Sequence, residues 1–303
     1  MYRVALWGLG EGYNVFTSGH GYEMVEVVAI ADKKGKLYKQ IDGIPIVVPQ
    51  KLACEYEYDY LIVTVVEEHT YKEIVREAVS MGIKREVIFP VRIFQIPFFN
   101  FDKYIQIKQS NISILSDYCF AGFLYHRFGL QFTSPTINMF TDNDNYYRFL
   151  QDIKSYMSAQ MVKVENEVEN VYKDTYTYPR GRIKDVEWVF NHDVNYETAA
   201  ERWKRGVERF NYDNFIAVMT IRSDEMAYKF NELPIEHKIG FYWKDLGLDS
   251  VIYMPEWQDE NIRAMLGYNF SGLTNRVADG TYGIQTIDWM KALLHEEGYC
   301  RIS

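Results

Sequence analysis

The stretch RVALWGLGEGYNVF, residues 3–16, decides the fold of the first part of the chain. Its apolar start is followed by a glycine-rich turn from Gly8 to Gly12, and the residues after that turn can form a helix. A strand, a tight glycine turn and a helix in this order are typical of the first unit of a Rossmann-like, nucleotide-binding sheet. The stretch therefore predicts a parallel sheet with the glycine turn at the carboxyl end of its first strand.

Apolar runs and helical segments continue to alternate after this turn. Residues 25–31 and 60–66 are almost continuously apolar, as parallel strands covered on both faces should be. Thr70 and Glu73 have the spacing of a capping box, which predicts that a helix begins at Thr70. This alternation with short connections predicts a Rossmann-like parallel sheet of the α/β class over residues 1–109.

The second half of the chain repeats the alternation. Residues 112–115, 186–190 and 215–219 have the composition of strands, and apolar residues at helical spacing lie between the last two runs. We expect a second α/β domain over residues 110–303, with the boundary between the two domains near residue 109.

The composition indicates a folded protein of a reducing compartment. Apolar residues make up 48% of the chain, and a net charge of -9 argues against a surface that binds nucleic acid, because such a surface needs clustered lysine and arginine. No apolar run approaches the roughly 20 residues that a membrane helix needs, and the early first strand leaves no room for a signal peptide. The cysteines are odd in number and widely spaced, so we expect no disulfide framework, no metal site and a cytoplasmic location.

The glycine turn has some, but not all, features of a dinucleotide site. Gly8 and Gly10 lie where a backbone approaches a pyrophosphate, and Asp32 follows Gly8 by 24 residues, near the place of a ribose-binding acid. The last glycine of the usual fingerprint is replaced by Tyr13, with Gly12 one place early. Two interpretations stay open: a site for NAD or a nucleotide sugar built from Gly8, Gly10, Gly12 and Asp32, or a scaffold without cofactor.

The densest polar cluster follows the predicted strand at residues 112–115. Loops after the carboxyl ends of strands usually hold the sites of α/β proteins, so Asp117 and Cys119 are candidate catalytic residues. Cys119 is a nucleophile if His126 activates it, and otherwise a buried structural thiol. The next polar loop supplies three candidate substrate-binding residues: Ser134, Thr136 and Asn138.

Two later clusters complete the candidate residues. Arg182 could grip a carboxylate or phosphate with two hydrogen bonds, and it could equally pair with Asp185; both are candidate catalytic residues. Asn211 and Asp213, which precede a predicted strand, are candidate substrate-binding residues. His192, beside an aspartate at the end of a strand, could act as a base.

Residues 112–140, ISILSDYCFAGFLYHRFGLQFTSPTINMF, resemble a bacterial family of domains of unknown function, number 1919, whose members carry the description exopolysaccharide biosynthesis protein. The matching positions include Cys119, Gly122 and Gly129, and the resemblance continues through Trp203 to about residue 245. Where the family has two glycines after the cysteine, this chain has alanine and glycine. The resemblance implies a role in building or decorating a cell-surface polysaccharide, without naming a reaction.

Three functions follow as hypotheses. The first is a transferase that acts on an activated sugar or glycan precursor. The second is a protein without catalysis that binds a nucleotide or nucleotide sugar at the glycine turn. The third is an NAD-dependent oxidoreductase, for which the sequence offers only the YxxxK spacing of Tyr104 and Lys108 and no convincing hydride-handling residue.

Overall fold

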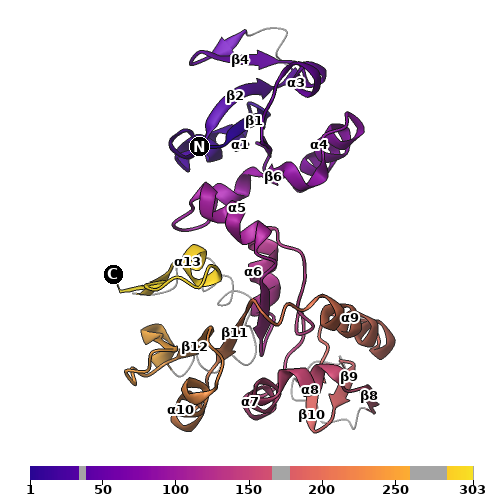
Figure 1. Ribbon diagram of the computed structural model, residues 1–303, viewed down its shortest axis with the longest axis vertical. Helices are drawn as coiled ribbons and strands as arrows, with labels where there is room; N and C mark the ends of the chain where they lie inside the picture. Colours follow the sequence, from indigo (N-terminus) through magenta and orange to yellow (C-terminus); the bar gives the residue numbers. More distant parts are fainter. Residues whose placement is uncertain (34–38, 166–177, 260–284, 303) are drawn as a thin grey trace. The chain divides into compact units, whose positions relative to one another are not determined.

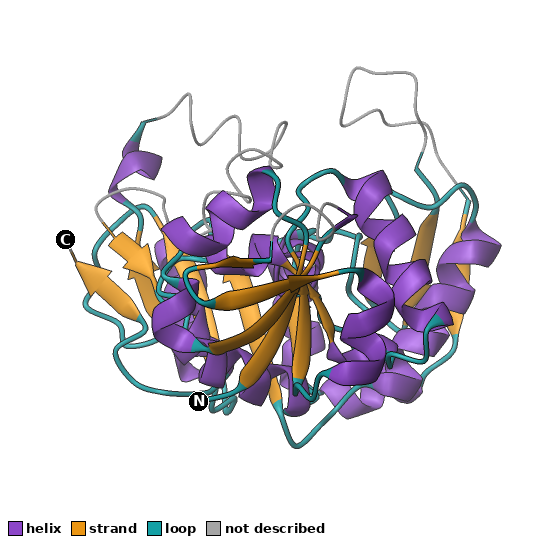
Figure 2. Cartoon of the chain, turned by 90° about the horizontal axis from the view of Figure 1, so that it is seen from above, coloured by secondary structure: helices purple, strands orange, loops and turns teal. Residues whose placement is uncertain are grey.

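The computed structural model describes residues 1–33, 39–165, 178–259 and 285–302. Contacts between Cα atoms divide the chain into two units, Met1–Ile105 and Gln106–Ser303. Each unit contains a mostly parallel sheet with helices, so the predicted α/β class is confirmed (Figure 1). Figure 2 shows in purple the helices that flank the orange strands.

The first unit is built on a six-stranded sheet in the order β3-β4-β2-β1-β5-β6. All neighbouring strands are parallel except β3 and β4, which pair antiparallel. Because β1 lies between β2 and β5, the strand order reverses beside it, and ligands of open α/β sheets bind at such a reversal. The strands are β1 (Arg3–Trp7), β2 (Glu26–Ala31), β3 (Gln40–Ile41), β4 (Ile44–Val47), β5 (Tyr60–Val63) and β6 (Ile88–Pro90).

One helix of this unit begins earlier than the sequence indicated. The predicted capping box at Thr70 is wrong, because the helix begins at Glu68 and the carboxylate of Glu67 accepts hydrogen bonds from the N–H groups of His69 and Thr70 at 2.7 and 2.6 Å. A hydrogen bond with the Thr70 side chain, together with these two main-chain bonds, lowers the pKa of Glu67 to about 2. The helices are α1 (Glu11–Ser18), α2 (Gly21–Met24), α3 (Pro49–Glu55) and α4 (Glu68–Ser80), with 3-10 turns η2 (Arg85–Val87) and η3 (Val91–Gln95). The division between the two units falls within the next helix, α5 (Phe101–Gln109).

The second unit is built on four parallel strands in the order β13-β12-β11-β7. A three-stranded antiparallel sheet, β10-β9-β8, and a two-stranded pair, β14-β15, accompany it. The strands are β7 (Ser113–Ser116), β8 (Met161–Val164), β9 (Arg180–Ile183), β10 (Val186–Val189), β11 (Phe215–Thr220), β12 (Lys238–Tyr242), β13 (Val251–Tyr253), β14 (Gln285–Ile287) and β15 (Cys300–Ile302).

A close backbone approach fixes α9 (Tyr196–Arg209), the longest helix among the described residues of this unit. A Cβ atom on Gly206 would lie 2.4 Å from the Cα atom of Pro135, so the helix packs directly on the loop that contains Ser134. Trp203 of the same helix is buried against Trp188, with ring centroids 5.8 Å apart. The helices are α6 (Phe120–Phe128), α7 (Asn143–Gln151), α8 (Ile153–Ser158), α9 (Tyr196–Arg209), α10 (Asp224–Glu232) and α13 (Trp289–Leu293), with the 3-10 turn η4 (Pro255–Gln258).

Membrane insertion through a helix finds no support in the described segments. None of the helices there combines the length and the apolar character that crossing a bilayer requires.

Candidate functional site

Polar side chains gather at the carboxyl edge of the four-stranded sheet. β7 is followed by Asp117, Tyr118 and Cys119, and the neighbouring strand β11 is followed by Arg222. The carboxyl ends of parallel strands meet at one edge of a sheet, which is where α/β proteins usually bind ligands. The predicted placement of Asp117 and Cys119 after a strand is therefore what the structure has.

Asp117 lies beneath this edge, with 1% of its surface exposed. Both carboxylate oxygens accept from the N–H of Thr220, at 3.2 and 3.1 Å, and the main-chain oxygen accepts from the N–H of Thr141. Burial raises the pKa of Asp117 to about 7, although the bonds from Thr220 and the charge of Arg222 oppose the increase. The side chain thus joins the ends of β7 and β11 and can hold a proton near neutral pH.

The thiol of Cys119 lies beside an imidazole from a distant part of the chain. Its Sγ atom is 3.6 Å from Nε2 of His192, and the amide of Asn191 donates to Sγ at 3.4 Å. Burial raises the pKa of the thiol, so the neutral form predominates until a base takes the proton. Asn191 and His192 lie in the loop that follows β10.

His126, the partner expected for Cys119, lies elsewhere. It is exposed near the end of α6, seven residues beyond Cys119, which corresponds to about 10 Å along a helix. The structure brings Cys119 together with His192 instead, and His192 and Cys119 are 73 residues apart in the sequence.

An ion pair holds the loop of His192 in place. Asp193 pairs with Arg202 of α9 through two guanidinium nitrogens, one of them Nε at 3.2 Å from Oδ1. Arg202 also donates to the main-chain oxygen of Ile137. Only 11% of the Asp193 side chain and 23% of the Arg202 side chain are exposed, so solvent screens the pair weakly. The loop after β10, helix α9 and the loop before α7 are thereby tied together.

The loop of Ser134, Thr136 and Asn138 covers the outer edge of β7. The N–H of Ser116 donates to Oγ1 of Thr136 at 3.2 Å, and the hydroxyls of Ser134 and Thr136 bond to each other at the same distance. Both residues are buried, so their polar groups serve an edge strand that would otherwise be unpaired. Asn138 has a φ of 57°, and its Oδ1 atom lies 2.8 Å from where a Cβ on Gly122 would be.

Arg182 and Asp185 lie in the β9–β10 hairpin, away from Cys119. Asp185 accepts from the hydroxyl of Tyr156 at 2.7 Å and lies 3.5 Å from Nε of Arg148, not beside Arg182. Arg182 is exposed, and its backbone pairs with Glu187. Because Asp185 precedes β10 whereas the loop of His192 follows it, the two lie at opposite ends of that strand.

Asn211 and Asp213 lie at the amino edge of the four-stranded sheet, opposite the edge of Cys119. The N–H of Asn211 donates to Oγ of Ser113 at 2.9 Å, and the N–H of Asp213 donates to Oδ1 of Asn211 at 3.1 Å. Both residues thus shape the turn before β11. The structure does not bring them together with Asp117.

Arg222 supplies a cation at the carboxyl edge of β11. Its guanidinium lies over the ring of Tyr118, 5.4 Å from the centroid, and donates to the Tyr118 hydroxyl. Tyr118 in turn stacks on Phe140, and Asn143 accepts from the N–H of Arg222 at 2.9 Å. Arg222 is exposed and contacts Tyr118, the residue before Cys119, so it can bind an anionic group of a substrate.

The glycine turn of the first unit has room for a phosphate. Gly8 has a φ of +118° and accepts from the hydroxyl of Thr64 at 2.6 Å, while a Cβ on Gly12 would lie 2.3 Å from the backbone of Thr64. A Cβ on Gly10 would meet nothing within 4 Å. The three glycines therefore provide a tight turn, an open approach and close helix packing, the three roles of the dinucleotide fingerprint, despite the altered spacing.

The charged side chains around this turn are less favourable to a phosphate than its backbone is. Glu11 lies in the first turn of α1, where its carboxylate would repel an anion. Asp32, at the end of β2, accepts from the N–H of Leu9 at 3.0 Å and so braces the turn. The backbone at Gly10 thus leaves open space, whereas the acidic side chains around the turn disfavour an anion.

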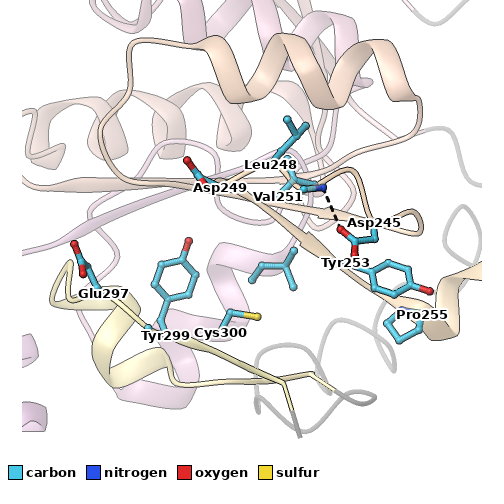
Figure 3. A pocket seen from close by; sticks show the side chains of 12 residues that line it. Asp245, Leu248, Asp249, Val251, Tyr253, Pro255, Glu297, Tyr299 and Cys300 are labelled. Carbon is cyan, nitrogen blue, oxygen red and sulfur yellow. Dashed lines mark hydrogen bonds between the residues drawn. The ribbon is translucent and has the colours of Figure 1, made fainter.

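A cavity of about 460 Å³ lies along β13, at the other edge of the sheet from β7 (Figure 3). None of its described lining residues is Lys, Arg or His, so the lining disfavours phosphate groups. Its tyrosines and carboxylates suit a neutral ligand rich in hydroxyl groups. The polar and aromatic lining residues are Asp245, Asp249, Tyr253, Glu297, Tyr299 and Cys300.

The described residues contain no cluster of three or more His, Cys, Asp or Glu side chains that could hold a metal ion.

Comparisons with known proteins extend over most of the chain. Residues 91–291 match the family model described as domain of unknown function DUF1919. The chain belongs to the DUF1919 family. Residues 1–89 match the model of a C2185-like N-terminal domain. An uncharacterised protein of Haemophilus influenzae is 26% identical to this DUF1919 protein over 169 residues, which are 54% of the chain and 78% of the relative.

The predicted family membership is thus confirmed. Asn191 and Arg222 of the DUF1919 domain were missed from the sequence. Arg222 follows a predicted strand, so the argument applied to Asp117 could have found it. Asn191 offered no such signal beyond its place beside His192.

Proposed function

We propose that this DUF1919 protein is an enzyme that transfers a group to or from an activated sugar or glycan precursor of a cell-surface polysaccharide. The observation that carries the proposal is the 3.6 Å separation of Cys119 Sγ and His192 Nε2 at the carboxyl edge of a parallel sheet. A nucleophile within reach of a base is the arrangement that covalent catalysis needs. The three free cysteines fit the reducing cytoplasm, where we place the reaction.

Each residue of this centre has a role in the proposal. Cys119 is the nucleophile, His192 takes its proton, and the amide of Asn191 stabilises the charge that develops on sulfur. Arg222 binds an anionic group of the activated substrate. Asp117 fixes the ends of the two strands on which the other groups depend.

Replacing Cys119 with alanine is expected to remove the product of this enzyme from the surface polysaccharide. The measurement is the composition and NMR spectrum of polysaccharide from a strain whose only copy of the gene encodes the variant. Cys54→Ala, which alters an exposed cysteine of the other unit, is the matched control and should leave the polysaccharide unchanged. Polysaccharide of normal amount and structure from a strain with Cys119→Ala would contradict the proposal.

Nucleotide binding by the first unit is a second function that one observation favours, namely the open space at Gly10. We expect NAD or a nucleotide sugar to raise the melting temperature of the full chain, because a ligand bound only by the folded state stabilises it by about 3 kcal/mol at a hundred times its dissociation constant. Gly10→Ala should lower the melting temperature without ligand only slightly, by weakening the N-cap of α1, and should abolish most of this increase. If NAD, NADP, UDP-sugars and GDP-sugars all leave the unaltered chain at the same melting temperature, the second function is wrong.

The oxidoreductase hypothesis has less support. Tyr104 is fully buried, and burial raises the pKa of its hydroxyl. Lys108 donates to the main-chain oxygen of Gly129 at 2.5 Å. The YxxxK spacing therefore describes a packed helix more readily than a catalytic pair.

A further inference from the structure

We infer that Cys119 carries an acyl group as a thioester between an acyl thioester donor and a sugar hydroxyl. This inference rests on the proposed function and names the class of group that is transferred. The imidazole of His192 and the amide of Asn191 both contact the sulfur atom of Cys119, which directly precedes α6, and together they suit attack on a carbonyl carbon.

The surroundings of Cys119 can stabilise the charges of acyl transfer. Cys119 directly precedes α6, a helix of nine residues, and its sulfur accepts no cap hydrogen bond from the first N–H groups of that helix. The N–H of Ala121 in the first turn already donates to Oγ of Ser116 at 3.0 Å, but the helix dipole still adds a partial positive charge at this end. This partial charge favours the negative charge of an oxyanion that forms on a carbonyl next to Sγ.

Glycosyl transfer through a covalent intermediate is less suited to these residues. Enzymes that hold a sugar covalently use an accessible pair of carboxylates. Here Asp117 is buried under the sheet edge, and Asp193 is bonded to Arg202. The remaining nucleophile is the partly exposed thiol of Cys119, whose natural product with an activated acyl group is a thioester.

Arg222 indicates which kind of molecule carries the acyl group of the donor. Its exposed guanidinium lies over Tyr118, the residue next to Cys119, and can bind a phosphate with two hydrogen bonds. A thioester on a phosphate-bearing carrier, such as coenzyme A, presents both the acyl carbon and the anion. The acceptor is a sugar hydroxyl, because a hydroxyl needs only a base to attack the thioester.

Both halves of the reaction balance. In the first, His192 takes the thiol proton, Sγ of Cys119 bonds to the acyl carbon, and the carrier sulfur leaves and takes the proton from His192. In the second, the sugar hydroxyl gives its proton to His192 while its oxygen bonds to the acyl carbon. The bond from that carbon to Sγ then breaks, and the thiol regains the proton.

The test is the intact mass of the full chain after incubation with acetyl-coenzyme A or succinyl-coenzyme A. We expect the mass of one acyl group, located at Cys119 by peptide mapping and released by hydroxylamine. Cys54→Ala should acquire the group at the same rate, and Cys119→Ala should not acquire it. His192→Gln should slow its formation by about 10²- to 10⁴-fold, the usual contribution of a general base.

A second acyl donor tests whether Arg222 binds the phosphate of the carrier. Acetyl-N-acetylcysteamine has the thioester but no phosphate, so Arg222→Ala should slow acylation by acetyl-coenzyme A much more than acylation by this smaller donor. Melting temperatures close to that of the unaltered chain show that the variants fold.

Two results would overturn the inference: no acyl group on Cys119 of the unaltered chain with any donor, or acylation that proceeds equally fast in His192→Gln or at Cys54. The polysaccharide of the Cys119→Ala strain tests the proposed function separately. A changed polysaccharide without acylation of Cys119 would leave the catalytic site standing and remove the acyl thioester.

Discussion

Replacing Asp117 with asparagine is expected to raise the stability of the protein at pH 8 and to flatten the pH dependence of its unfolding. Burial raises the pKa of this carboxyl group from 3.8 to about 7. Between about pH 4 and pH 7 the folded chain therefore holds a proton that the unfolded chain releases, and the free energy of unfolding falls as the pH rises through this window. A difference of three pKa units corresponds to a loss on the order of 4 kcal/mol above pH 7.

Asparagine removes this loss because it has no charge to bury. Its side-chain oxygen can still accept from the N–H of Thr220, as the carboxylate oxygens do at 3.2 and 3.1 Å. The measurement is urea unfolding of both proteins at pH 5, 6, 7 and 8. Asp213→Asn, at an exposed position, is the control and should follow the unaltered chain. A pH dependence of Asp117→Asn that matches the unaltered chain would show that Asp117 is not the group responsible.

The fold could be predicted from the sequence because both sheets follow from local patterns. Buried parallel strands are almost continuously apolar, as in β5 and in β2 after Glu26, and the helices between them show an apolar stripe. The start of α4 was misplaced because several polar residues can cap a helix. Thr70 and Glu67 both have suitable side chains, and only the backbone path determines that Glu67 accepts the two N–H groups.

The candidate site could be predicted only in part. The rule that sites follow parallel strands found Asp117 and Cys119, and it excludes Asn211, which precedes β11 rather than following it. The polar side chain of Thr136 did not indicate that this residue is buried. A hydroxyl that pairs with an edge strand, as that of Thr136 does with β7, looks the same in the sequence as a hydroxyl that binds a substrate.

The pairing of Cys119 with His192 could not be read from the sequence at all. It depends on how the chain returns from the β8–β10 sheet to the end of β7, over 73 residues. A contact between residues so far apart leaves no periodic pattern in the sequence. The strands that precede Cys119 and His192 do leave such a pattern.

The ion pair of Asp193 and Arg202 holds the loop of His192 in place. Removing either partner is expected to destabilise the second unit. Arg202→Met leaves a carboxylate that is only 11% exposed without its cation. Breaking a buried pair on one side costs about 3 to 5 kcal/mol, and some exposure of this pair places the expected loss near the lower value. Asp193→Asn should cost less, because Arg202 keeps its bond to the main-chain oxygen of Ile137.

The double variant with Asp193→Asn and Arg202→Met separates the contribution of the ion pair to stability from the contribution of packing. With both charges removed, no unpaired charge remains, so the stability lost in Arg202→Met should return in part, and the coupling energy between the two positions should be about 1 to 3 kcal/mol. The measurement is urea unfolding of the two single variants and the double variant, with Arg205→Met, at an exposed arginine of the same helix, as the matched control. Losses that simply add in the double variant would mean that the ion pair does not hold the loop of His192, and that packing of α9 on the loop at Pro135 holds it instead.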